Sequence, residues 1–172
     1  ETNTETILVD SGYPDRDVDA FRGDTDATVH PMLRLEPVIE ALIDEHNSFS
    51  AFEQAFEQRV RAALRNEYVA LKSIAAYRRG LNLGPADRSD AREAFDTLRP
   101  GWDGRVESPR LLDYCLHNAL TIAGGLDAPV QFHTGFGDPD AHPRFVNPVH
   151  LVECIEAHPE TEVVMLHGGY PY

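Results

Sequence analysis

Short apolar runs alternate with longer amphipathic segments along the whole chain. Five runs predict β-strands, at residues 6–10 (TILVD), 29–36 (VHPMLRLE), 68–77 (YVALKSIAAY), 130–133 (VQFH) and 162–167 (EVVMLH), the second weakened by Pro31. Apolar residues at helical spacing predict helices that begin at Pro37 and at Ser48 or Ser50, and further helices over residues 91–98, 109–123 and 148–158. The pattern therefore predicts repeated strand–helix units.

Strands that are separated by helices pair in parallel through right-handed crossovers. The predicted strands are continuous apolar runs, which is typical of a sheet covered on both faces. An open doubly wound sheet and a (β/α)8 TIM barrel both satisfy this α/β pattern. No Gly-rich phosphate loop follows a strand, which argues against a dinucleotide-binding sheet. Five strand–helix units in 172 residues match the length per unit of a barrel of about 250 residues. We expect a single barrel domain over residues 1–172, incomplete at both ends.

Two histidines end neighbouring predicted strands and are followed by glycines. His133 ends VQFH before TGFGD, and His167 ends VVMLH before GGYPY. The carboxyl ends of successive parallel strands meet at one rim, where barrel active sites lie. Neutral imidazoles are good ligands for zinc-like metals, and glycines leave room for a ligand. A hydrogen-bonded polar group at a strand end is the alternative for each histidine, but the repeated pattern favours a functional pair.

Four segments carry a resemblance to a known family: MLRLE, ALKSIAAYRRGL, PVQFHTGFGDPD and VVMLHGGYPY. They resemble the amidohydrolase domain that is also found fused to glutamine-synthetase-like domains in plants and fungi. The resemblance implies a metal-dependent (β/α)8 barrel with an HxH pair on strand one, one histidine on each of strands five and six, and an aspartate on strand eight. The five predicted strands then correspond to strands two to six, and no HxH occurs in the sequence.

The resemblance also implies roles for individual residues. His133 would be a metal ligand, and His167 would be a metal ligand or a catalytic group that stabilises an oxyanion. Lys72, the one lysine of the chain, would bridge metals as a carboxylated side chain or bind substrate as a cation, with a structural ion pair as the alternative. Arg34 and Arg78 are candidates for binding a substrate carboxylate, Arg78 also within the catalytic group, although arginines in such positions more often form ordinary ion pairs.

Several further polar residues have weaker standing. Glu36 would hold a substrate-binding arginine in place by pairing with Arg34 or Arg78. Asp138 would orient a metal ligand. Asp140 and Asp10 could act likewise, but acidic residues beside Gly and Pro more often form turns. The six other histidines show no ligand spacing, and we expect packing or surface roles for them: His30, His46, His117, His142, His150 and His158.

These features predict a hydrolase of small polar or carboxylate substrates, acting on a C–N or related bond through metal-activated water. The expected cofactor is one or two divalent ions, zinc first, with manganese or iron as alternatives. A metal-dependent decarboxylase, a non-catalytic regulatory barrel and an unrelated α/β domain remain open. By itself, a chain that begins at Glu1 and ends at Tyr172 is expected to be inactive and to form homo-oligomers through its raw sheet edges.

Charge and cysteine content indicate which partners and which cellular location to expect. The net charge is −14, with 29 acidic residues against 15 basic ones, which argues against nucleic acid and anionic membranes as partners. The near-absence of lysine also fits an acidic protein adapted to high salt. Cys115 and Cys154 lie in predicted amphipathic helices without a CxxC partner, so we expect reduced thiols and a cytoplasmic location.

Overall fold

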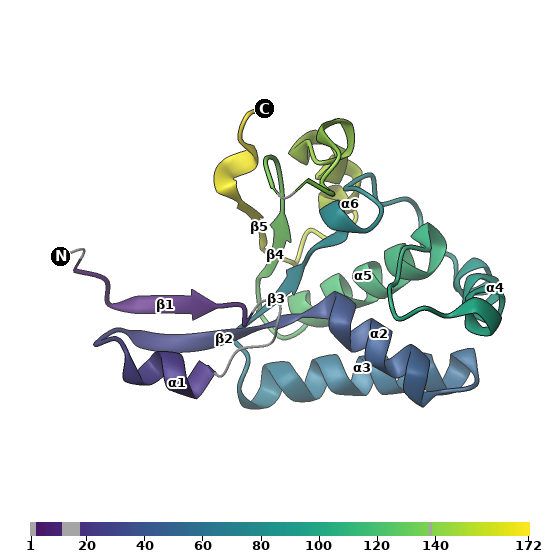
Figure 1. Ribbon diagram of the computed structural model, residues 1–172, viewed down its shortest axis with the longest axis horizontal. Helices are drawn as coiled ribbons and strands as arrows, with labels where there is room; N and C mark the ends of the chain where they lie inside the picture. Colours follow the sequence, from purple (N-terminus) through teal and green to yellow (C-terminus); the bar gives the residue numbers. More distant parts are fainter. Residues whose placement is uncertain (1–2, 12–17, 138) are drawn as a thin grey trace.

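The computed structural model describes residues 3–11, 18–137 and 139–172 of the chain. Strands and helices alternate along it, as the apolar pattern predicted (Figure 1). The strands are β1 (Thr6–Val9), β2 (Thr28–Arg34), β3 (Ala70–Ser73), β4 (Val130–His133) and β5 (Val163–Leu166). The helices are α1 (Val18–Gly23), α2 (Leu35–Glu45), α3 (Phe49–Asn66), α4 (Arg88–Leu98), α5 (Pro109–Gly124) and α6 (Val152–Glu156).

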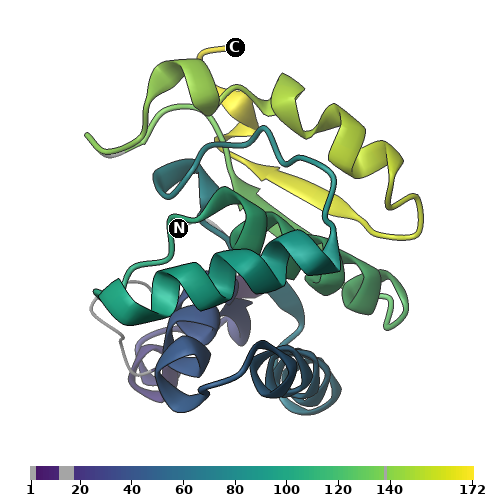
Figure 2. The same cartoon turned by 90° about the vertical axis from the view of Figure 1, so that its right-hand side faces the viewer.

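The five strands form one parallel sheet in sequence order, β1-β2-β3-β4-β5. The sheet curls into a half-barrel, and the helices lie on its outer side (Figures 1 and 2). This confirms the predicted α/β barrel class and the predicted order of five strands. Because all strands run the same way, their carboxyl ends open at one rim.

The core lies between the sheet and the outer helices. Helix α3 packs against α2 and α5, and α4 packs against α5. Ser48 caps α3 by accepting a hydrogen bond from the amide of Ala51, 3.4 Å away, as the sequence predicted for this position. Buried aromatic rings fill the layer, with those of Phe52 and Phe95 only 5.1 Å apart between centroids. The apolar stripes of the helices thus close the outer face of the sheet.

The inner face of the sheet is polar, and strand register explains why. Arg34 on β2 is the register partner of Lys72 on β3, which in turn pairs with Gln131 on β4. Side chains on neighbouring strands at the same register point to the same face. His133 follows Gln131 by two residues, so it shares that face. The sheet therefore aligns four polar side chains toward the inside of the half-barrel.

Several predicted boundaries were wrong. The strand predicted over residues 68–77 is only Ala70–Ser73 and is followed by a tight turn at Ala75–Tyr77, in which the amides of Arg78, Arg79 and Gly80 all donate to the carbonyl of Ala75. Helix α2 begins two residues before Pro37, and the helix predicted over residues 148–158 is a short 3-10 turn followed by α6.

Pro31 does not weaken β2, contrary to the sequence-based expectation. Its register partner is Val9 on β1, and its carbonyl accepts a hydrogen bond from the amide of Val69, 3.2 Å away. The N–H and C=O of one strand residue point to the same side, and β3 begins pairing only opposite Met32. The missing N–H of Pro31 therefore removes no ladder hydrogen bond.

Both cysteines lie in helices as predicted, are buried and are free thiols. Burial raises the pKa of Cys154 to about 11 and that of Cys115 further still. Across the described parts of the chain, no helix combines the length and the apolar character that crossing a bilayer requires.

Candidate active site

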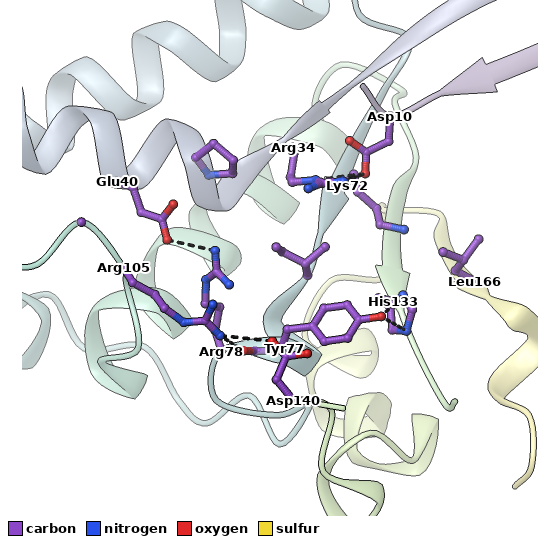
Figure 3. A pocket seen from close by; sticks show the side chains of 13 residues that line it. Asp10, Arg34, Glu40, Lys72, Tyr77, Arg78, Arg105, His133, Asp140 and Leu166 are labelled. Atoms are coloured by element: carbon purple, nitrogen blue, oxygen red, sulfur yellow. Dashed lines mark hydrogen bonds and ion pairs between the residues drawn. The ribbon is translucent and has the colours of Figure 1, made fainter. Parts of the chain in front are cut away.

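A cavity of about 710 Å³ opens at the carboxyl ends of β2, β3 and β4 (Figure 3). The polar groups at its wall come from segments far apart in the sequence, which the parallel sheet gathers at one rim. Its charged and polar lining residues are Asp10, Arg34, Glu40, Lys72, Tyr77, Arg78, Arg105, His133 and Asp140. Three sequence-predicted residues, Arg34, Lys72 and Arg78, thus meet His133 in one cavity.

The two strand-end histidines lie side by side. Their ring centroids are 4.9 Å apart, and the rings meet nearly edge to face at 69°. His133 is the last residue of β4 and is 7% exposed, whereas His167 directly follows β5 and is exposed. The predicted proximity of the two imidazoles is what the parallel pairing of β4 with β5 produces.

His167 sits in an unusual backbone conformation. Its φ is +65°, and Gly168 and Gly169 follow with φ of +58° and +73°. A non-glycine residue in the left-handed region costs about 1–2 kcal/mol, and such strain clusters at functional sites. This left-handed turn directly follows β5, where the ring of His167 lies beside that of His133.

Tyr77 is a site residue that the sequence analysis missed. Its hydroxyl lies 2.7 Å from Nε2 of His133, and the two rings are 4.5 Å apart between centroids. A Cβ at Gly137 would lie 2.5 Å from the Tyr77 hydroxyl and 2.8 Å from Nε2 of His133, so only glycine fits there. The apolar run hid Tyr77 inside a predicted strand, whereas the turn at Ala75–Tyr77 places it at the rim.

Lys72 is nearly buried, at 3% exposed, and its ammonium donates a hydrogen bond to Oε1 of Gln131, 2.8 Å away. Desolvation lowers the pKa of Lys72 to about 8, although the nearby carboxylate of Asp10 opposes the shift. In Figure 3 its side chain extends along the cavity toward the side where His133 lies. Lys72 is therefore a cation that can release its proton close to neutral pH.

The two predicted carboxylate-binding arginines each have an acidic partner. Arg34 donates from Nε and from a terminal nitrogen to Oδ2 of Asp10, at 3.0 and 2.7 Å. Arg78 donates to Oε1 of Glu40 at 3.2 Å, and the same oxygen accepts the amide of Val106 at 3.0 Å. These pairs hold both guanidinium groups at the cavity wall.

Arg105 and Asp140 extend the wall from two loops. Arg105 donates to the carbonyl of Tyr77 at 2.6 Å and to Oδ2 of Asp140 at 3.5 Å. The sequence analysis overlooked Arg105 because it stands in a polar loop with no strand or helix pattern to place it. Asp138, predicted to orient a metal ligand, lies outside the described residues.

Glu36 does not pair with Arg34 or Arg78, and this prediction was wrong. Its side chain is fully buried, and its Oε1 accepts hydrogen bonds from Oγ of Ser73 at 2.7 Å and from the amide of Ile74 at 2.9 Å. Desolvation raises the pKa of Glu36 despite these bonds. Glu36 therefore fixes the chain where β3 ends, directly before the turn that carries Tyr77.

The donor chemistry of the histidine pair fits a divalent metal. The Tyr77 hydroxyl lies 2.7 Å from Nε2 and 3.2 Å from Nδ1 of His133. A neutral imidazole carries a lone pair on one ring nitrogen, which is the donor that zinc-like metals bind. Among residues 3–11, 18–137 and 139–172, no third His, Cys, Asp or Glu joins His133 and His167 within ligand spacing. One group of three with such spacing does occur there, formed by His117, Cys154 and His158.

Comparisons with known proteins agree with the fold. The profile of the family described as Amidohydrolase matches residues 38–172. Protein fluG of Emericella nidulans is 27% identical over 201 residues, which cover 98% of this chain and 23% of the fungal protein. The crystal structure of a candidate metal-dependent hydrolase from Lactobacillus casei superposes with a TM-score of 0.91 and 35% identity over 98% of this chain and 46% of that one.

A more distant crystal structure shares the fold alone. Uronate isomerase from Thermotoga maritima superposes with a TM-score of 0.63 at 10% identity, over 94% of this chain and 43% of that chain. The chain spans less than half the length of each of these relatives.

Proposed function

Because the chain belongs to the amidohydrolase family, we propose that it supplies the metal-binding and substrate-binding wall of a metal-dependent hydrolase. The proposed substrate is a small molecule with a carboxylate and a C–N or related hydrolysable bond. The observation that carries this proposal is the close pairing of the His133 and His167 rings beside a cavity rich in cationic groups.

His133 and His167 would hold the ion, and the nitrogen ligands favour zinc, with manganese or iron as alternatives. A bound ion of this kind polarises a carbonyl and brings the pKa of a bound water toward neutrality. Lys72 shares the inner face with His133, and its low pKa favours the neutral amine that carboxylation requires. Tyr77 orients the imidazole of His133 through its hydroxyl.

Charge at the cavity supports an anionic substrate. Four cationic side chains line it, from Arg34, Lys72, Arg78 and Arg105, against three carboxylates, from Asp10, Glu40 and Asp140. With Lys72 in its ammonium form, the described lining thus carries one more positive than negative charge, in a chain whose net charge is −14. A local positive field in an otherwise acidic protein concentrates small anions at the cavity. Arginine forks match a substrate carboxylate in shape, so Arg34 and Arg78 would bind it at the wall.

Metal content measured by elemental mass spectrometry tests the metal site. We expect His133→Ala and His167→Ala to lose about one equivalent of metal relative to the unchanged protein, with the circular dichroism spectrum intact. His46→Ala is the matched control, because this histidine at the end of α2 lies outside the cavity and should leave the metal content unchanged. Equal metal content in all four proteins would refute the proposed site.

A substrate screen tests the reaction. N-acylated and N-carbamoylated amino acids present both a carboxylate and a C–N bond. In a longer protein that contains this chain within a whole barrel, we expect amine release that falls in Arg78→Ala through a raised KM. Carbon dioxide release without amine release would instead assign a decarboxylase to the same site.

A further inference from the structure

A second group of metal-ligating side chains lies outside the cavity. One ring nitrogen each from His117 and His158 and the sulfur of Cys154 all lie within 4.8 Å of one another. His117 belongs to α5, Cys154 to α6, and His158 to the turn that follows α6. None of the three lines the cavity at the rim. The group therefore lies where α5 meets the end of α6.

Helical spacing and packing create this cluster. Cys154 and His158 are four residues apart across the end of α6, so their side chains lie on the same side. The His158 amide donates to the carbonyl of Ile155 at 3.0 Å, which continues the helical turn to this residue. Nδ1 of His117 is 2.7 Å from Nε2 of His158, and the ring centroids are 5.0 Å apart.

The hydrogen bonds of His117 fix its tautomer. Its Nε2 lies 3.0 Å from the carbonyl oxygen of Gly84, and a carbonyl only accepts, so Nε2 carries the proton. Nδ1 therefore presents a lone pair toward His158. A ring N–H held by a backbone carbonyl is the arrangement that orients a metal-ligating histidine.

A buried carboxylate adds negative charge beside the cluster. Asp113 precedes His117 by one helical turn of α5 and is only 4% exposed. Its Oδ2 accepts from Arg79 at 3.0 Å and from the amide of Gly84 at 2.9 Å, while its buried Oδ1 has no hydrogen-bond partner. A buried polar atom without a partner calls for an explanation, and a cation with its bound water would supply one.

We propose that His117, Cys154 and His158 form a structural site for a zinc-like divalent ion, with a water as the fourth ligand. One sulfur and two imidazole nitrogens are a typical zinc donor set. Around a tetrahedral ion with N–metal bonds of about 2.0 Å, the two nitrogens would stand about 3.3 Å apart, slightly more than the present 2.7 Å. Small rotations of the two rings achieve this.

Binding of the ion releases one proton. The thiol of Cys154 loses its proton to solvent and becomes the thiolate ligand, while His158 binds through Nε2 with its proton on Nδ1. A surface cavity of about 460 Å³ borders His158. The site would tie the end of α6 to α5 and to the loop at Gly84.

Cobalt binding tests this site independently of the proposed hydrolase function. Adding Co²⁺ to the metal-free protein should give a thiolate-to-cobalt charge-transfer band in the near ultraviolet, at one equivalent. We expect the band to disappear in Cys154→Ser and in His158→Ala, and to remain in His133→Ala and in the matched control Cys115→Ser. Because His158 is only half-buried, its variant should stay folded even where a change at Cys154 destabilises the chain.

Stabilisation by Zn²⁺ gives a second readout. The ion should raise the melting temperature of the unchanged protein and of His133→Ala, but not of His158→Ala, because binding to the folded state alone stabilises it. A missing band in the unchanged protein, or a band that persists in Cys154→Ser, would overturn the proposal. In His133→Ala, loss of the metal held at His133 together with a retained cobalt–thiolate band would show that the two metal sites are independent.

Discussion

Replacing Lys72 by Met should stabilise the protein at neutral pH. Burial lowers the pKa of Lys72 from 10.5 to about 8, so the charged form destabilises the folded state. At 1.36 kcal/mol per pKa unit, the cost below pH 8 is about 3 kcal/mol. Methionine has similar length and no charge, but it loses the hydrogen bond to Gln131, which is worth about 1 kcal/mol. The net gain at pH 7 is about 2 kcal/mol.

The pH dependence gives the sharper test. Between pH 8 and 10.5 the unfolded chain holds the Lys72 proton that the folded chain has lost, so the stability of the unchanged protein rises with pH in this window. The advantage of Lys72→Met should therefore be about 2 kcal/mol at pH 7 and close to zero near pH 10.

Urea unfolding at pH 7 and at pH 10, followed by circular dichroism, measures the difference. Lys72→Arg is the control, because its guanidinium stays charged at both pH values and should be less stable than lysine at each. A Lys72→Met protein that is less stable than the unchanged protein at pH 7, or a difference that does not change with pH, would refute the assignment of Lys72 as a buried, destabilising cation.

Three further substitutions test single contacts. Tyr77→Phe should keep the fold but weaken metal binding at His133 by about 10–100-fold, as loss of a ligand-orienting group does, measured by competition with a chelator; unchanged affinity would exclude an orienting role. Arg79→Met should lower the free energy of unfolding by about 3 kcal/mol, because it leaves the carboxylate of Asp113 buried without its cation; a urea midpoint within error of the unchanged protein would contradict this. Glu36→Gln removes a fully buried charge while keeping an acceptor oxygen, so we expect a more stable protein at pH 7. The difference should vanish below pH 4, where both the folded and the unfolded chain hold the Glu36 proton. Chemical unfolding across pH 4–7 measures it, and a destabilised variant at pH 7 would oppose the reasoning.

Local patterning in the sequence determined the architecture. Apolar runs bounded by turn residues set the five strands, and helical spacing between them required parallel pairing. Since parallel strands bring their carboxyl ends to one rim, the proximity of His133 and His167 followed from their positions at strand ends. The cavity residues on strands, Arg34 and Lys72, were predictable for the same reason, because strand register is a local, periodic property.

Only the tertiary structure decided which side chains meet across different elements. Tyr77 contacts His133 because a tight turn replaces the predicted strand end, and the buried carboxylate of Glu36 holds the start of that turn. His117 and His158 come within hydrogen-bond distance only through the packing of outer elements that lie 41 residues apart in the chain. No sequence period encodes such contacts, because they depend on how helices and loops cross after the core has formed, and a side chain's burial and pKa are set by those crossings.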